Sequence, residues 1–253
     1  VRKDTFNIDI NALEEQIKIV KEQGRLNPRV IIAVDLFGQP AEFNEIRRIA
    51  EKEELLLLED GAQGFGGRIG DKKTCSFGDI STTSFFPAKP LGCYGDGGAI
   101  FTDNDGWAEL IRSYKVHGKG MNKYDNLRIG MNSRLDSIQA AVLLAKLPVF
   151  MTEEVEKANS VGFKYTEALK DIVISPIVLK RYFSSWAQYT IQLRDRKTRD
   201  GLQAYLKEQG IPSMVYYKKP MHRQGAFEGN VYKYIDNMYS NTNQLCETVL
   251  SLP

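Results

Sequence analysis

The chain has 253 residues, which suits one large or two modest domains and is enough to bury an ordinary core. Hydrophobic residues make up 42% and charged residues 26%, a composition typical of a soluble globular protein and not of a disordered one. The formal net charge of +2 gives no electrostatic case for nucleic acid as the main partner. The longest purely apolar run, Leu55 to Leu58, is too short to span a bilayer, which argues against a transmembrane protein.

The cysteine and histidine content argues against a disulfide framework and against a metal site. Cys75, Cys93 and Cys246 are too few for such a framework and lack paired metal-ligand spacing. His117 and His222 are the only histidines, so no histidine-rich metal site is expected. The charged start of the chain has no signal-peptide pattern. We therefore expect a cytoplasmic protein with reduced thiols, no metal, and neither a membrane nor a nucleic acid as partner.

The first half of the chain alternates helix-like and strand-like segments. Apolar residues spaced by three and four predict helices, and short β-branched or leucine-rich runs predict buried strands. In chain order we expect a helix over 11–22, a strand over 29–35, a helix over 42–52, a strand over 55–60, and strands over 79–86 and 98–102. This order predicts an α/β fold with a mostly parallel sheet flanked by helices, whose ligands bind beyond the carboxyl ends of the strands.

The second half predicts a smaller α+β domain. A helix over 135–147 is expected to end at Pro148, and a charged helical stretch over 153–164 leads into the second region. A strand over 188–193, a helix over 197–209 and a strand over 215–217 then follow. We therefore expect a large domain over 1–147 and a small domain over 148–253.

The first chemically informative segment is Glu59-Asp60-Gly-Ala-Gln63, at the end of a predicted strand. A carboxylate there is costly unless a cation or several donors meet it. Asp60 is thus either a helix cap or surface residue, or the partner of a protonated ring nitrogen.

The second segment, residues 81–98, places hydroxyls, an aromatic pair and a single lysine, Lys89, before a glycine-dense turn. This pattern suits a phosphorylated, planar ligand with a carbonyl group, because hydroxyls hold phosphate, glycines allow close approach and a lysine can form an imine. A solvated surface lysine is the alternative, which the neighbours Phe85, Phe86 and Leu91 make less favourable.

The third segment, Gly130-Met-Asn132-Ser-Arg134, comes just before a predicted long helix. The start of a helix favours an anion through its dipole and its free N–H groups. A helix cap with a surface arginine explains this segment equally well.

The three segments occur together and in order, as Asp60-x-x-Gln63, Ser84-x-x-x-x-Lys89, Gly92-x-x-Gly95-Asp96-Gly97-Gly98 and Gly130-x-Asn132-x-Arg134. The combination resembles the DegT/DnrJ/EryC1/StrS family of sugar aminotransferases, which depend on pyridoxal phosphate and are a branch of fold type I. The resemblance runs over nearly the whole chain. Because members of this family normally have further residues before the point where Val1 falls, it also implies that the N-terminal part is missing.

The resemblance implies how five residues contact the cofactor, pyridoxal 5′-phosphate. Lys89 would bind it covalently as an imine, and Asp60 would pair with the protonated ring nitrogen. Gln63 would lie near the phenolic oxygen and Ser84 would bind the phosphate. Asn132 would reach the phosphate held by a second subunit, so the active unit would be a homodimer.

The resemblance also implies the reaction. Residues 83–96 and 187–190 are most similar to enzymes that aminate a UDP-2-acetamido-3-oxo-hexuronic acid for surface polysaccharide, including lipopolysaccharide, with glutamate as the expected amino donor. Candidate contacts with this nucleotide sugar are Tyr94, His117, Arg134, Tyr217 and His222. For the two histidines, a surface or capping role is the alternative.

Two other functions remain open. A sugar dehydratase that uses pyridoxal phosphate shares the fold, but the 3-deoxy type replaces the imine-forming lysine with histidine, and position 89 is lysine. A non-catalytic protein that senses or binds the sugar or the cofactor is the second alternative, although Lys89 and Asp60 would then have no evident role.

Overall fold

The computed structural model describes residues 1–122, 124–227 and 236–253. In chain order its helices and strands are α1 (Ile10–Gln23), β1 (Val30–Val34), α2 (Phe43–Lys52), β2 (Leu56–Asp60), β3 (Arg68–Ile69), β4 (Lys72–Lys73), β5 (Ile80–Ser84), β6 (Gly98–Phe101), α3 (Asp105–Tyr114), α4 (Ser137–Val149), α5 (Val155–Leu169), β7 (Tyr182–Phe183), β8 (Tyr189–Gln192), α6 (Arg196–Glu208), α7 (Ser240–Thr248) and β9 (Val249–Leu252).

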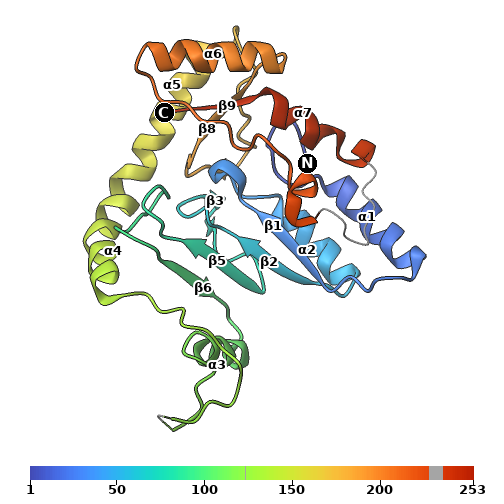
Figure 1. Cartoon of the computed structure of the whole chain (residues 1–253), viewed down its shortest axis with the longest axis vertical. Coiled ribbons are helices and arrows are strands. Elements are labelled where there is room, and N and C mark those ends of the chain that lie inside the picture. The colour runs from blue at the N-terminus through green and yellow to red at the C-terminus, as the bar shows by residue number, and fades with distance from the viewer. Residues whose placement is uncertain (123, 228–235) are drawn as a thin grey trace.

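The central sheet has the strand order β1-β2-β5-β6 (Figure 1). Strands β1, β2 and β5 run parallel, and only β6 is antiparallel to its neighbour. Val34 pairs with Asp60, and Asp60 pairs with Thr82, so these three strands end at one edge. The expected α/β fold with a mostly parallel sheet is confirmed.

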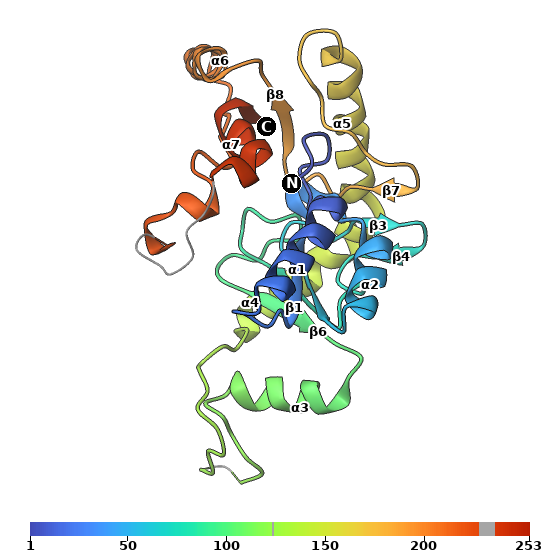
Figure 2. The ribbon, with the colours of Figure 1, turned by 90° about the vertical axis from the view of Figure 1, so that its right-hand side faces the viewer.

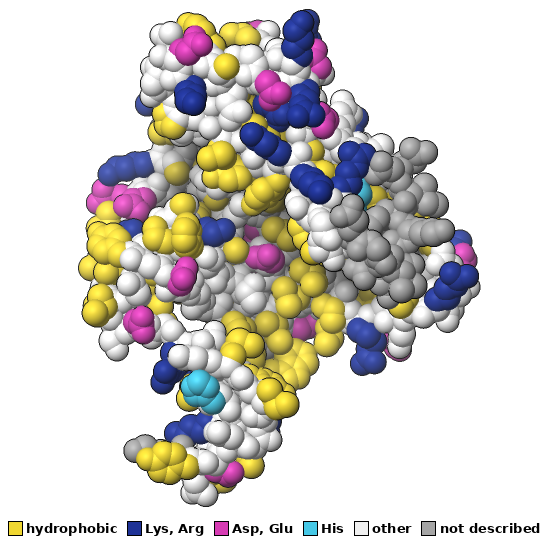
Figure 3. Space-filling view, viewed as in Figure 1, with side chains coloured by type: hydrophobic (Ala, Val, Ile, Leu, Met, Phe, Trp, Pro, Cys, Tyr) yellow, Lys and Arg dark blue, Asp and Glu magenta, His cyan; other side chains and the backbone are white. Residues whose placement is uncertain are grey.

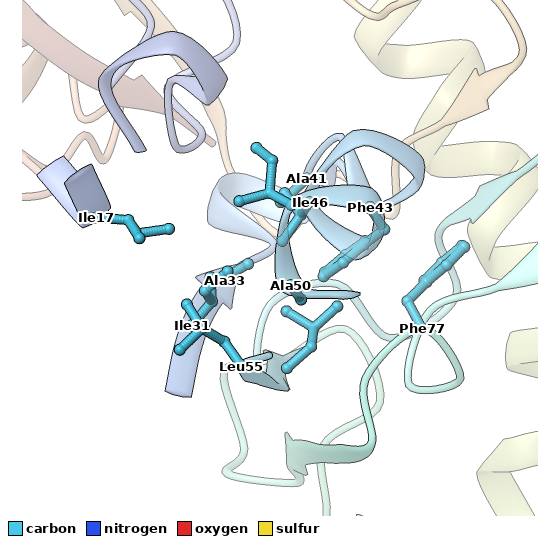
Figure 4. Close-up of a cluster of buried hydrophobic side chains, with 11 residues drawn as sticks. Ile17, Ile31, Ala33, Ala41, Phe43, Ile46, Ala50, Leu55 and Phe77 are labelled. Carbon is cyan, nitrogen blue, oxygen red and sulfur yellow. The ribbon is translucent and has the colours of Figure 1, made fainter. Parts of the chain in front are cut away.

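One face of this sheet packs against α1 and α2. In β1 every second residue is buried, and Ile31 and Ala33 meet Phe43 and Ile46 of α2 in the core (Figure 4). Phe77 stacks on Phe43 with ring centroids 4.8 Å apart, which adds the loop before β5 to the same core. The opposite face of the sheet exposes apolar side chains, and Figure 3 shows such side chains gathered over the strands; they include Val30, Ile32, Val34, Leu56 and Ile100.

The smaller unit is built on β8 and β9, which are antiparallel, with α6 and α7 beside them. Its core contains Ile191 and Leu250 but also Phe6 and Phe37 from the start of the chain. The strand expected over 215–217 is wrong, because only Met214 forms a bridge, to Ser251, and the chain then turns. The apolar Val215 is buried by packing in this core without strand pairing.

The helix expected to end at Pro148 continues past it. Pro148 lies inside α4, and a π-helical turn over Phe150–Glu154 leads directly into α5. Proline lacks the N–H of a regular helix, and the chain accommodates this by the wider turn that follows. The buried Phe150 in that turn packs against Phe65, with the ring centroids 5.9 Å apart. Helices α4 and α5 therefore form one continuous helical rod (Figure 1), and Pro148 lies within α4.

Residues 115–122 and 124–135, here called the arm, project away from the sheet beside α3 in both views (Figures 1 and 2). A bridge between Val116 and Asn132 joins the two sides of the arm. Its apolar side chains are strongly exposed, with Met121 at 97% and Ile129 at 98%. None of the helices in the described ranges combines the length and apolar character that a membrane crossing requires.

The packing of α2 on the sheet gives a stability prediction. Ile46→Ala removes a fully buried side chain from the core, and we expect it to lower the free energy of unfolding by about 2–5 kcal/mol. Ile172→Ala is the matched control, because the side chain of Ile172 is 76% exposed, and it should change that free energy by less than about 1 kcal/mol. Urea denaturation measures both, and equal losses would contradict the core assignment.

Candidate active site

Asp60 and Ser84 lie at the same edge of the central sheet, because each is the last residue of one of two adjacent parallel strands. The half-buried carboxylate of Asp60 accepts the backbone N–H of Ala62 at 3.1 Å. Within the described residues it forms no ion pair. One neutral donor compensates a carboxylate only in part, so this edge favours a cationic ligand.

Glu59 faces the opposite way and is completely buried. Its carboxylate accepts the backbone N–H groups of Cys75, Phe77 and Gly78 and the hydroxyl of Ser81, with Phe77 and Ser81 at 2.7 Å. Four donors compensate the lost hydration of a buried charge. Glu59 therefore ties β2 to the loop before β5 and fixes the strand end that carries Asp60.

Gln63 links this edge to the smaller unit. Its Oε1 accepts the backbone N–H of Phe37 at 2.7 Å, and its Nε2 donates to the hydroxyl of Tyr217 at 3.4 Å. The Ser185 hydroxyl donates to the Gln63 carbonyl at 2.7 Å. Tyr217, 154 residues away in sequence, is thereby brought beside the turn that follows Asp60.

Lys89 lies in the loop between β5 and β6. Phe85 and Leu91 are buried and Lys89 itself is half-buried, but Phe86 is 50% exposed, so the apolar setting inferred from the sequence holds for Phe85 and Leu91 and is wrong for Phe86. Among the described residues its ammonium group has neither a hydrogen bond nor an ion pair, whereas its backbone N–H donates to the carbonyl of Phe86 at 2.8 Å. From the described residues the hydroxyl of Ser84 accepts just the N–H of Phe86, at 3.3 Å, so its own proton is available to a ligand.

Helix α4 holds the glycine-dense turn that follows Lys89. Gln139 accepts the backbone N–H of Tyr94 at 2.8 Å, and the ammonium group of Lys146 donates to the carbonyl of Gly92. Gly92 packs so closely that a Cβ there would be 2.5 Å from the carbonyl oxygen of Pro87. The Tyr94 ring itself is 77% exposed. Sequence patterns did not single out Gln139 and Lys146 as supports of this turn.

The remaining expected contact residues lie elsewhere. Asn132, Arg134 and His117 are exposed on the arm, where Arg134 Nε donates to Asn132 Oδ1 at 2.9 Å. No described hydrogen bond joins these three to Asp60, Gln63 or Lys89. His222 lies on a short 3₁₀ turn, and its ring stacks on Tyr239 with centroids 4.5 Å apart.

The thiol of Cys75 is a buried titratable group beside this edge. Burial, and then the negative charge of Glu59, raises the pKa of the Cys75 thiol to about 12, so that this thiol is neutral. All three cysteines are free and buried. In the ranges that the structure describes, no three His, Cys, Asp or Glu side chains are grouped to hold a metal ion.

The four donors on Glu59 give a second prediction. Glu59→Gln keeps the size of the side chain but replaces one acceptor oxygen with an NH₂ group, which faces donors. We expect a loss of unfolding free energy on the order of 3 kcal/mol. Glu51→Gln, on the exposed side of α2, is the control and should stay within about 0.5 kcal/mol. A Glu59 variant as stable as this control would show that the buried carboxylate does not hold the loop.

Comparison with known proteins places this geometry in a family. The chain is 42% identical over 225 residues to the UDP-2-acetamido-2-deoxy-3-oxo-D-glucuronate aminotransferase of Pseudomonas aeruginosa, covering 88% of this chain and 59% of that protein. It is 38% identical over 253 residues to the pleiotropic regulatory protein of Geobacillus stearothermophilus, covering 98% and 64%. The crystal structure of a DegT DnrJ EryC1 StrS aminotransferase from Brucella abortus superposes with a TM-score of 0.94 at 46% identity, covering all of this chain and 66% of that one.

The chain thus spans about six tenths of the length of these curated relatives. The family model of the DegT/DnrJ/EryC1/StrS aminotransferases matches residues 1–253. The resemblance inferred from the motifs is confirmed, and the chain belongs to the DegT/DnrJ/EryC1/StrS aminotransferase family.

Proposed function

We propose that the protein is an aminotransferase that uses pyridoxal 5′-phosphate to move an amino group from glutamate to a nucleotide-linked keto-sugar. The observation that carries this proposal is the Asp60 carboxylate, which ends a central strand with one neutral donor and no cation among the described residues. A protonated pyridine nitrogen is a cation of the size and shape that this edge lacks.

The other residues at this edge fit the same cofactor. Ser84 has a hydroxyl proton available for a phosphate oxygen at the end of the neighbouring strand. Lys89 offers an amine without a partner in the described chain. Gln63 Nε2, together with Tyr217, supplies donors for the phenolic oxygen. Together these residues offer a hydrogen-bond donor for the phosphate, an amine for covalent attachment and a negative charge for the ring nitrogen.

Asp60 and Lys89 would act in the transfer itself. When bound, pyridoxal phosphate supplies an electron-accepting ring. This ring stabilises the negative charge that remains on the substrate carbon after its proton has left. Asp60 would pair with the protonated ring nitrogen and so would keep the proton there and orient the ring. Lys89 would hold the cofactor covalently through Nζ, and once its amine is free it would act as a general base for the proton that leaves the substrate carbon.

We propose a UDP-2-acetamido-3-oxo-hexuronic acid as the acceptor sugar. The support is the name of the Pseudomonas relative, which is 42% identical to this chain over 225 residues, together with the resemblance inferred from the sequence of residues 83–96 and 187–190. Tyr94, Tyr217, His117, Arg134 and His222 are the proposed contacts. Tyr217 has the best structural support, because its hydroxyl already meets Gln63.

The proposed active unit is a homodimer in which Asn132 serves the site of the second copy. The exposed apolar side chains of the arm support this, because such side chains are normally covered by a partner. A two-fold axis would bring the same arm to both sites, so one interface would complete two pockets. We also propose that the protein works in the cytoplasm and that its product enters surface polysaccharide, including lipopolysaccharide.

A regulatory protein is the second candidate, because one relative at 38% identity carries that name. A regulator could bind the same cofactor or sugar without turnover. Steady formation of an amino sugar from glutamate and a UDP-3-keto sugar would exclude a purely regulatory role, whereas binding without turnover would favour it. The presence of lysine at position 89 speaks against the 3-deoxy type of dehydratase.

The covalent anchor can be tested directly. Lys89→Ala should leave the fold intact but abolish attachment of pyridoxal phosphate that borohydride can trap, because no amine remains at this position. Lys73→Ala, at an exposed site on β4, is the control and should still be labelled. Peptide mass mapping of the reduced protein locates the label. A label that persists at another lysine in the Lys89 variant would overturn the assignment.

Sharing between subunits can be tested by mixing variants. Subunits with Asn132→Ala and subunits with Lys89→Ala should be inactive or weak alone. In a heterodimer both lesions should fall in one pocket and leave the other intact, so that part of the activity returns. Heterodimers that form without any recovery would mean that Asn132 serves its own subunit or no site.

A further inference from the structure

Asp35 is a fully buried carboxyl group to which the proposed reaction gives no role. It directly follows β1, and its backbone N–H donates to the carbonyl of Asp60 at 3.0 Å. Its Oδ1 accepts the backbone N–H of Ala41 at 3.1 Å, whereas no group among the described residues donates a hydrogen bond to Oδ2. A completely buried carboxylate oxygen without a donor is rare, because it loses its hydration without compensation.

The free oxygen of Asp35 lies behind the turn that carries the site. A Cβ added at Gly64 would collide with Oδ2 of Asp35, and one at Gly61 would be 3.6 Å from it. Because this turn follows Asp60 and contains Gln63, the state of Asp35 bears on two of the proposed cofactor contacts. Oδ2 is also the atom that could hold a proton, since Oδ1 already accepts from Ala41.

Three carboxyl groups therefore share the ends of β1 and β2 but differ in their compensation. Glu59 has four donors, Asp60 is partly exposed, and Asp35 has one donor and no exposure. Burial, and then the charge of Glu59, raises the pKa of Asp35 well above its usual range, and the charge of Asp60 adds to this effect. The fourth titratable group here, Cys75, is a neutral thiol and supplies no balancing charge.

We propose that Asp35 is a positioning residue that stays protonated in the folded protein and so leaves Asp60 as the ionised carboxylate at this edge. If Asp35 were ionised, its repulsion would favour a proton on Asp60, and Asp60 could no longer hold a proton on the ring nitrogen. A neutral Asp35 avoids this competition while its Oδ1 still holds Ala41. The consequence for Asp60 rests on the proposed function, but the protonation of Asp35 does not.

The protonation can be tested in the protein without cofactor. The folded chain would hold a proton on Asp35 that the unfolded chain releases above about pH 4, so rising pH disfavours folding by up to about tenfold per pH unit until Asp35 ionises. Asp35→Asn cannot release such a proton. The ratio of its folding constant to that of the wild type should therefore rise about tenfold per pH unit from about pH 5 and then level off.

Urea denaturation from pH 5 to pH 9 measures this ratio. Asp103→Asn is the control, because Asp103 is exposed, and its ratio should not change with pH. An equally flat ratio for Asp35→Asn would show that Asp35 is ionised when folded and would overturn the proposal. If Asp35→Asn does not fold, infrared spectra of wild-type protein labelled with ¹³C-aspartate decide, because a protonated aspartic acid band at pH 7 is expected and its absence contradicts the proposal.

A second readout tests the consequence for Asp60. Pyridoxal phosphate labelled with ¹⁵N at the ring reports by NMR whether the bound ring nitrogen is protonated. Asp35→Asn should keep this proton and Asp60→Asn should lose it. Loss of the proton in Asp35→Asn would contradict the proposal, because it would mean that a negative charge on Asp35 helps to keep the ring nitrogen protonated. If the wild type binds no cofactor at all, the proposed function fails, whereas the pH dependence of folding still decides the state of Asp35.

Discussion

The structure depends on how negative charge is compensated at the carboxyl end of β2. Two consecutive acidic residues, Glu59 and Asp60, point to opposite faces of the sheet at this strand end. Their negative charges are compensated in different ways. Glu59 is buried and takes four donors from the loop before β5 and from β5 itself, which fastens adjacent strands together. In the described part of the chain Asp60 has one neutral donor, and it is the carboxylate that we propose to meet a ligand. The stability of one carboxylate thus fixes the place of the one proposed to act.

The same turn also joins the two parts of the chain. Gln63 contacts Phe37 and Tyr217, and Ser185 donates to its carbonyl, so four distant segments meet at one amide side chain and its backbone. Tyr217 belongs to the smaller unit. A shift of that unit would therefore change the contact between Tyr217 and Gln63, next to Asp60. Helix α4 links the arm to the proposed site. It begins after the arm, and its Gln139 and Lys146 hydrogen-bond to the turn that follows Lys89.

The sequence predicted the parts of this arrangement that depend on local patterns. Leucine-rich and β-branched runs located β1 and β2, and the expected parallel order put Asp60 at the carboxyl end of a strand. The strand expected over 79–86 ends two residues earlier in the structure, at Ser84, and this brings Ser84 to the same edge as Asp60. The partners of Glu59 and the Gln63–Tyr217 contact were not predictable, because they come from irregular loops and from residues far apart in sequence. Pro148 misled because packing of Phe150 favours a continued helix. Helix α3 was missed, although its cap, Asn104, is a recognisable signal.

We propose above that the negative charge of Asp60 keeps a proton on the nitrogen of a bound pyridine ring. The most direct measurement is the single-turnover rate of the reaction with glutamate in protein loaded with pyridoxal phosphate, compared between wild type and Asp60→Asn. The amide keeps the volume of the side chain and its acceptor for Ala62 but carries no charge. We expect a rate lower by roughly a hundredfold or more, because a preorganised charge is lost. A rate close to that of the wild type would remove Asp60 from the mechanism and contradict the account.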